Sequence, residues 1–263
     1  MSLNLLNSNR NRILPLKDDV VYGPVNSRRL GKSLGINLLT ASTKVCTLNC
    51  LYCQYGYTAI KPDMLTQPAN FFPAGMIRDG LEEILKNGSC RPDYLTFSGN
   101  GEATLHPDFP DLVKAVKSLR DGYCPDARTA ILSNGTQIGQ PQIQAAFTEL
   151  VNIIIKLDCA ETVLYRHYNR PVIPVNLKRM ISILAGLPNI TIQALFTAGK
   201  GGNFSGAHLK TWIRTIQVIR PVMVQLYSLD RGYSSKHITK LSADDLQPLA
   251  DELLRSGIPA RRY

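Results

Sequence analysis

From about residue 34 to its end, the chain alternates between short β-type segments and longer helix-type segments. Short apolar runs, such as residues 94–98 and 151–157, are typical of buried strands. The segments between them, such as residues 76–86, place apolar side chains at helical spacing. A helix that joins two strands carries the chain back to the end of the sheet at which the first strand began. The alternation therefore predicts parallel strands with right-handed crossovers. A doubly wound sheet and a full or partial (β/α) barrel both satisfy this pattern.

We expect about six βα units within residues 34–263. Residues 1–33 lack the alternation and are expected to form an N-terminal extension. The expected strands are residues 33–39, 94–98, 128–132, 151–157, 190–196, 222–227 and 258–263. The expected helices are residues 76–86, 110–119, 142–150, 175–185, 207–218 and 243–255.

The composition is typical of a soluble globular protein. Its apolar fraction is 44% with charges of both signs, which argues against a disordered chain. A chain of 263 residues buries enough surface to fold without disulfide bonds. The sequence contains no run of about 18 apolar residues, and residues 1–16 do not have the pattern of a secretory signal. We therefore expect a cytoplasmic protein with no membrane partner.

Positive charge gathers at both ends of the sequence. The formal net charge is +10, of which residues 1–33 contribute +4 and residues 200–263 contribute +5. Such an excess can form a patch that binds tRNA or another polyanion. An ordinary basic surface without such a partner explains the charge equally well.

Cys46, Cys50 and Cys53 follow the first expected strand with the spacing C-x3-C-x2-C. Three thiolates on one loop can bind three irons of a [4Fe–4S] cluster and leave the fourth iron open to an outside ligand. Structural zinc would need a fourth Cys or His nearby, and a C-x2-C redox pair would leave Cys46 without a role. The spacing therefore favours the open cluster. The remaining cysteines are isolated and are expected to be buried small residues: Cys90, Cys124 and Cys159.

This cysteine spacing resembles that of the radical S-adenosylmethionine (SAM) superfamily, and Tyr52 stands where that family has an aromatic residue before the third cysteine. Residues 98–103 (SGNGEA), after the second expected strand, are similar to the family's Gly-Gly-Glu-Pro motif, with alanine in place of proline. That motif receives the amino group of SAM, because glycines let backbone carbonyls approach an ammonium group closely. The resemblance therefore assigns SAM binding to Gly99, Asn100, Gly101 and Glu102.

Polar residues end two further expected strands. Ser133 and Asn134 resemble the family's polar strand end near the ribose and carboxylate of SAM, although an ordinary turn would have the same sequence. Lys156 and Asp158 close the strand at residues 151–157, at the end of a barrel strand where catalytic residues gather. A surface ion pair is the alternative for these two residues. No residue is identified as the one that quenches a product radical.

A narrower resemblance covers most of the chain. Segments such as residues 22–25, 27–31, 33–37, 53–56, 98–107, 169–171 and 224–231 are similar to an Fe–S oxidoreductase group that includes the wyosine-type tRNA-modifying enzymes. Those enzymes build a tricyclic base on a tRNA guanosine and hold a second cluster on cysteines upstream of the radical SAM loop. This chain has no cysteine before Cys46. The resemblance therefore carries over the radical SAM core alone.

The resemblance implies a partial (β/α)6 barrel over residues 34–263, with cluster, SAM and substrate at the C-terminal ends of the strands. It also implies reductive cleavage of SAM to methionine and a 5′-deoxyadenosyl radical, with electrons from a flavodoxin- or ferredoxin-like donor. Three kinds of function remain open. They are a radical SAM enzyme acting on RNA or a nucleotide, one acting on a small metabolite or peptide, and an Fe–S redox protein without catalysis.

Overall fold

The computed structural model describes residues 13–88 and 90–263, which form two compact units. The N-terminal unit comprises Leu16–Thr47 and Ala59–Ile155, and the C-terminal unit comprises residues 13–15, Leu48–Thr58 and Lys156–Tyr263. Residues 1–12 of the expected N-terminal extension lie outside the described residues. The division between the units falls inside the cysteine loop, so that this loop contributes to both.

The strands of the N-terminal unit are neighbours in chain order. The first two are antiparallel, and each later strand is parallel to the one before it. The strands are β1 (Val21–Ser27), β2 (Gly31–Ile36), β3 (Tyr94–Phe97), β4 (Arg128–Ser133) and β5 (Asn152–Lys156). The helices are α1 (Ala74–Lys86), α2 (Phe109–Tyr123) and α3 (Pro141–Thr148), with short 3-10 helices at Pro62–Met64, Pro68–Asn70 and Ala103–Leu105.

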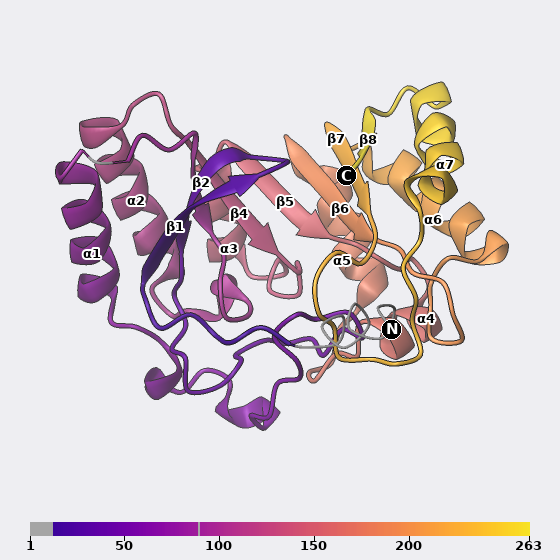
Figure 1. The fold of residues 1–263 in the computed structure, drawn as a ribbon, viewed down its shortest axis with the longest axis horizontal. Helices are drawn as coiled ribbons and strands as arrows, with labels where there is room; N and C mark the ends of the chain where they lie inside the picture. Colours follow the sequence, from indigo (N-terminus) through magenta and orange to yellow (C-terminus); the bar gives the residue numbers. More distant parts are fainter. Residues whose placement is uncertain (1–12, 89) are drawn as a thin grey trace, which may run out of the picture. The chain divides into compact units, whose positions relative to one another are not determined.

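Aromatic side chains join the layers of the N-terminal unit. Phe109 of α2 meets Phe97 of β3 and Phe147 of α3 edge to face, with ring centroids 5.5 and 6.2 Å apart. All three rings are fully buried. Helix α2 lies between α1 and α3 (Figure 1). Apolar side chains at helical spacing give each helix one face that covers the sheet, which is the pattern expected of a βα unit.

The C-terminal unit repeats the arrangement on a smaller scale. Its strands β6 (Ile190–Leu195), β7 (Met223–Tyr227) and β8 (Ala260–Arg262) are parallel neighbours. Its helices are α4 (Thr162–Tyr168), α5 (Leu177–Gly186), α6 (Gly206–Ile219) and α7 (Ala243–Arg255). The indole of Trp212 is fully buried, lies 5.1 Å from the ring of Phe196, and donates a hydrogen bond of 2.8 Å to the carbonyl of Leu157.

The expected strands and helices are all present, and their ends differ by a few residues from the expected ones. Apart from the three short 3-10 helices, one strand and one helix were not predicted. Strand β1 lies inside the expected extension and is antiparallel to β2, so it belongs to no βα unit. Helix α4 has seven residues, too few to show a periodic apolar stripe. Within the described ranges, no helix is both long and apolar enough to cross a bilayer.

Candidate functional site

In the N-terminal unit, the start of the cysteine loop pairs with the glycine-rich loop that follows β3. The N–H of Val45 donates to the carbonyl of Asn100 at 3.2 Å, and the N–H of Glu102 donates to the carbonyl of Val45 at 2.9 Å. Between them lies Gly101, where a Cβ atom would stand 1.8 Å from the Val45 carbonyl oxygen. Only glycine permits this approach, which fixes the backbone one residue before Cys46.

The side chain of Asn100 is fully buried and bonded to backbone groups. Its amide nitrogen donates to the carbonyls of Lys17, Leu39 and Thr40 at 2.8, 3.1 and 3.2 Å, and its oxygen accepts from the N–H of Lys17. The sequence predicted Asn100 to bind SAM through this loop, and that role stays a prediction. In the structure its side chain bonds the glycine-rich loop to Lys17 and to residues 39–40 and holds the loop in place.

Glu102 connects the glycine-rich loop to the end of β4. Its carboxylate accepts hydrogen bonds from Ser133 Oγ at 2.8 Å, from the Asn134 N–H at 2.7 Å and from Thr104 Oγ1 at 2.7 Å. The residue is 1% exposed. Burial raises the pKa of the Glu102 carboxyl, and the hydrogen bonds that it accepts act in the opposite direction. The structure therefore brings together three of the expected site residues, which come from two different strand ends.

The side chain of Asn134 reaches the first cysteine. Its amide nitrogen lies 3.5 Å from Cys46 Sγ and 2.9 Å from Thr47 Oγ1. Its oxygen accepts from the N–H and the hydroxyl of Thr136, at 3.0 and 2.8 Å. Because both ends of the amide are bonded, its orientation is set and an N–H points at the sulfur.

In the C-terminal unit, the carboxylate of Asp158 is the centre of a buried network. One oxygen accepts from the N–H of Leu195 and forms an ion pair with Lys156, both at 2.8 Å. The other oxygen accepts from the Asn169 amide at 2.8 Å and from the hydroxyl of Tyr52. Burial and the Asp158 carboxylate raise the pKa of the Tyr52 phenol well above its usual value. Tyr52 therefore stays neutral and anchors the cysteine loop through its hydroxyl.

The ammonium group of Lys156 lies between two aromatic rings. Its nitrogen is 4.8 Å from the ring centre of Tyr52 and 4.7 Å from that of Tyr227, and it donates to the Tyr227 hydroxyl at 2.7 Å. Burial alone would lower the pKa of Lys156, but Asp158 and Tyr227 favour the charged form and the net pKa is raised. The Asp158 side chain is buried and that of Lys156 is 17% exposed, so the pair is not the surface ion pair that the sequence also allowed. Gln193, also buried, accepts from the Tyr227 hydroxyl at 3.1 Å.

Asn169, just after α4, contacts the second cysteine. Its amide nitrogen lies 3.4 Å from Cys50 Sγ as well as 2.8 Å from Asp158. Its oxygen is buried and has no hydrogen-bond partner among the described residues. Asn169 was not among the residues predicted for the site. The available signal was the Asn-Arg-Pro run at residues 169–171, which belongs to the narrower family resemblance.

The cysteine loop turns tightly after Cys50, where the N–H of Cys53 donates to the Cys50 carbonyl at 3.0 Å. None of the chain's six cysteines, all of which are described, forms a disulfide. In the described part of the chain, no three His, Cys, Asp or Glu side chains are gathered as a metal site. Cys159 is buried, and burial together with Asp158 raises the pKa of its thiol, as expected of a small residue in the core.

Residues 40–188 match the family model of the radical SAM superfamily. The chain therefore belongs to the radical SAM superfamily. It is similar to a UPF0026 protein of Helicobacter pylori (strain ATCC 700392 / 26695), with 31% identity over 233 residues that cover 86% of this chain and 71% of the relative.

Two solved structures share the fold. A radical SAM methyltransferase from Sphaerobacter thermophilus has a TM-score of 0.63 at 15% identity, and the match covers 88% of this chain and 65% of that one. TYW1 with a lysine-pyruvate adduct bound has a TM-score of 0.55 at 15% identity, covering 85% of this chain and 73% of that one. These likenesses confirm the expected fold class, an α/β fold of the radical SAM type.

Proposed function

We propose that this radical SAM enzyme holds a [4Fe–4S] cluster on Cys46, Cys50 and Cys53. In the chemistry of the family, the reduced cluster gives one electron to SAM, which splits into methionine and a 5′-deoxyadenosyl radical that abstracts hydrogen from the substrate. The observation that carries the proposal is that two of the three sulfurs each have a side-chain amide N–H directed at them.

The donor set fits such a cluster. Thiolates are the protein ligands of Fe–S clusters, and N–H groups directed at their sulfurs stabilise the negative charge that iron-bound sulfur carries. Asn134 and Asn169 supply these N–H groups to Cys46 and Cys50. The unpartnered oxygen of Asn169 adds a buried acceptor beside Cys50 that a bound group can use.

The chain's own residues would position the cofactors. We assign the amino group of SAM to the backbone of Gly99 and Gly101, because their neighbour Glu102 is bonded to the end of β4 and holds the loop. Ser133 stands at that strand end as a further polar contact for SAM. This arrangement supports a rigid SAM site rather than one assembled on binding.

Lys156, Asp158 and Tyr52 support the other side of the cysteine loop. The Tyr52–Asp158 hydrogen bond fixes the residue before Cys53, and the ammonium of Lys156 keeps the carboxylate charged and in place. We propose positioning roles for these three residues.

We propose a nucleotide or RNA as the substrate and a flavodoxin- or ferredoxin-like protein as the electron donor. The net charge of +10 supports both partners, because RNA and such donors are acidic. A small metabolite or peptide substrate is the alternative for the reaction. A non-catalytic Fe–S protein is the alternative for the class of function.

The test is anaerobic reconstitution of the full chain with iron and sulfide, followed by SAM and dithionite. We expect methionine and 5′-deoxyadenosine, measured by mass spectrometry, from the natural chain. Cys53→Ala should abolish both products, and Cys124→Ala, a change at an isolated thiol, should retain them. Zinc in place of iron at the three thiols, or a reduced cluster that leaves SAM intact, would refute the proposal.

A further inference from the structure

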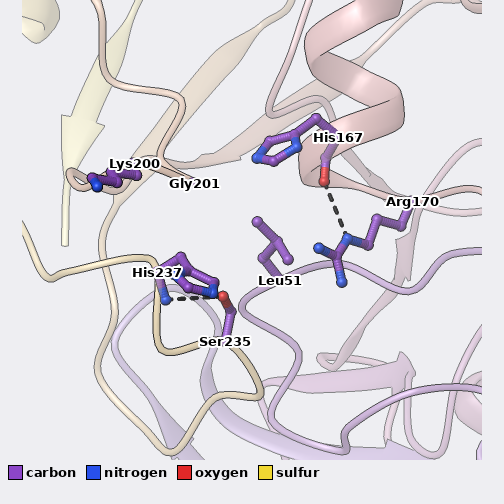
Figure 2. A pocket seen from close by; sticks show the side chains of 7 residues that line it. All are labelled: Leu51, His167, Arg170, Lys200, Gly201, Ser235 and His237. Atoms are coloured by element: carbon purple, nitrogen blue, oxygen red, sulfur yellow. Dashed lines mark hydrogen bonds between the residues drawn. The ribbon is translucent and has the colours of Figure 1, made fainter.

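Two contiguous hollows in the surface of the C-terminal unit share the residues Arg170, Ser235 and His237. Their volumes are about 160 and 350 Å³. We call them together the basic cleft, defined by the five basic residues that line it: His167, Arg170, Lys200, Lys236 and His237. Figure 2 shows Leu51 between the side of the cleft formed by His167 and Arg170 and the side formed by Ser235 and His237.

The basic cleft has no acidic residue in its lining. Its five basic side chains are exposed, and none of them is part of an ion pair among the described residues. Arg170, Lys200 and Lys236 place permanent positive charge in this lining, so the cleft is complementary to an anion. Elsewhere in the described residues, some surface lysines and arginines do pair with carboxylates, as Lys117 does with Glu149 at 2.5 Å.

Arg170 is held in a conformation that arginine rarely adopts. Its φ angle is +46°, in the left-handed region. The N–H of Asn49 donates to the Arg170 carbonyl at 3.0 Å, and Leu48 forms a bridge with Pro171, so the cysteine loop holds this backbone in place. These contacts fix the point at which the Arg170 side chain leaves the backbone.

The guanidinium group of Arg170 is oriented by two contacts. Its Nε donates to the carbonyl of His167 at 3.3 Å, as Figure 2 shows, and Nη1 donates to the hydroxyl of Tyr57 at 3.4 Å. The guanidinium lies 5.9 Å from the centre of the Tyr57 ring. Among the residues that the structure describes, Nη2 makes no such contact, so it can donate to an oxygen of a ligand.

Two of the loops that form the basic cleft follow the C-terminal ends of parallel strands, while His167 and Arg170 lie at the end of α4. Lys200 lies in the loop after β6, and Lys236 and His237 lie in the loop after β7. Leu51, from the cysteine loop, lines the same cleft. Ligands of α/β proteins bind at this end of the strands, so the cleft is on the substrate side of the C-terminal unit.

We propose that the basic cleft binds a phosphate ester of the substrate. Arginine, lysine and histidine around a concave surface match the charge and the several acceptor oxygens of a phosphate. The exposed ring of Tyr57 beside Arg170 offers a face on which a nucleotide base can stack. This inference rests on the proposed function for the reaction that follows binding, but binding itself requires no reduction of the cluster.

The experiment measures binding to the reconstituted full chain under anaerobic conditions. The probes are a fluorescein-labelled RNA stem-loop, followed by anisotropy, and unlabelled GMP and guanosine as competitors. Salt is varied between about 50 and 200 mM, because phosphate contacts make affinity fall with salt. The cleft variants are Arg170→Gln and Lys236→Gln. The matched control is Arg214→Gln, an exposed arginine of α6 that lines neither hollow.

We expect each cleft variant to weaken stem-loop binding about five-fold or more. The slope of the logarithm of affinity against the logarithm of salt concentration should become less steep by about one. Arg214→Gln should leave both quantities unchanged. Competition by GMP but not by guanosine would identify a single phosphate as sufficient. Binding of the stem-loop without competition by GMP would identify the RNA backbone as the source of the phosphate.

Unchanged RNA and GMP binding in both cleft variants would overturn the inference. Slower reduction of the cluster by flavodoxin in these variants, with unchanged RNA and GMP binding, would do the same and would assign the cleft to the electron donor. Formation of 5′-deoxyadenosine with dithionite is measured on the same samples. Its absence from a chain that shows the expected binding pattern would refute the proposed function and leave the phosphate site standing.

Discussion

The side-chain amide nitrogen of Asn169 lies 3.4 Å from the sulfur of Cys50. The same nitrogen is 2.8 Å from Asp158, so the carboxylate orients the amide and the amide in turn faces the thiol. In the N-terminal unit, Asn134 has the same relation to Cys46 at 3.5 Å. Residues that donate hydrogen bonds to ligand sulfurs change the reduction potential of a metal centre without binding the metal. The role of the two asparagines can therefore be measured through that potential.

The first prediction concerns the reduction potential of the reconstituted cluster. An N–H directed at a ligand sulfur favours the more negative, reduced state. If each bond is worth about 1 kcal/mol more in that state, Asn169→Ala or Asn134→Ala should lower the potential by roughly 40 mV. The measurement is a redox titration followed by EPR. Asn87→Ala, an exposed position after α1, is the control, and equal potentials in all three variants would contradict the prediction.

The second prediction concerns the contact between the glycine-rich loop and the cysteine loop. In Gly101→Ala the new methyl group would stand 1.8 Å from the Val45 carbonyl oxygen, so the backbone must move. We expect a loss of stability of about 2 kcal/mol or more in urea unfolding, with poorer cluster incorporation. Gly122→Ala is the control, because it lies within α2 with open space around it and should stabilise the chain by about 0.5–1 kcal/mol. Similar unfolding free energies for the two variants would show that the close approach of Gly101 to the Val45 carbonyl does not restrict residue 101.

The third prediction separates Asp158 from its ion-pair partner. Asp158→Ala leaves the ammonium of Lys156 buried without its counter-charge and removes the acceptor for Tyr52 and Asn169. We expect a loss of about 3–5 kcal/mol in the free energy of unfolding. Lys156→Met keeps most of the buried volume and the other hydrogen bonds of Asp158, so its loss should be smaller. Chemical unfolding of both variants tests the order, and a larger loss for Lys156→Met would contradict it.

The fourth prediction is a pH dependence of stability from His208. Its Nε2–H donates to the carbonyl of Asp158 at 3.2 Å, and its Nδ1 is buried with no partner among the described residues. Burial lowers the pKa of this imidazole below its usual value of 6.5. The folded state therefore binds fewer protons than the unfolded state, and stability should fall as the pH drops through 6.5 and below.

The variant that tests this dependence is His208→Gln, whose amide can still donate to Asp158. It should have a flatter profile of unfolding free energy between about pH 5.5 and 7.5 than the natural chain. Asn87→Ala, a change at an exposed residue with no titratable group, should have the same slope as the natural chain. If the profiles of unfolding free energy against pH were parallel for the natural chain and His208→Gln, His208 would be excluded as the source of the pH dependence.

Local patterns were sufficient for most elements of the fold. Helix α7 begins and ends where its apolar spacing predicts, because Ser242 caps it and Asp245 completes a capping box. Strand β1 was missed because it lies at the sheet edge and most of its residues are exposed, which leaves no apolar alternation to detect. The glycine at position 101 was recognised from the motif, but its reason, the Val45 carbonyl, is visible only in the folded chain.

The alternation of strands and helices and the spacing of the three cysteines could be read from the chain, because both depend on residues close together in sequence. The folded chain was needed to show that Asn169 meets Cys50 across 119 positions and that Asn134 meets Cys46 across 88. It was also needed to show that three loops and the end of α4 form the basic cleft. Such contacts join residues far apart in sequence and form only when packing brings the ends of the strands together. A local pattern of residue types therefore does not reveal which distant residues will meet.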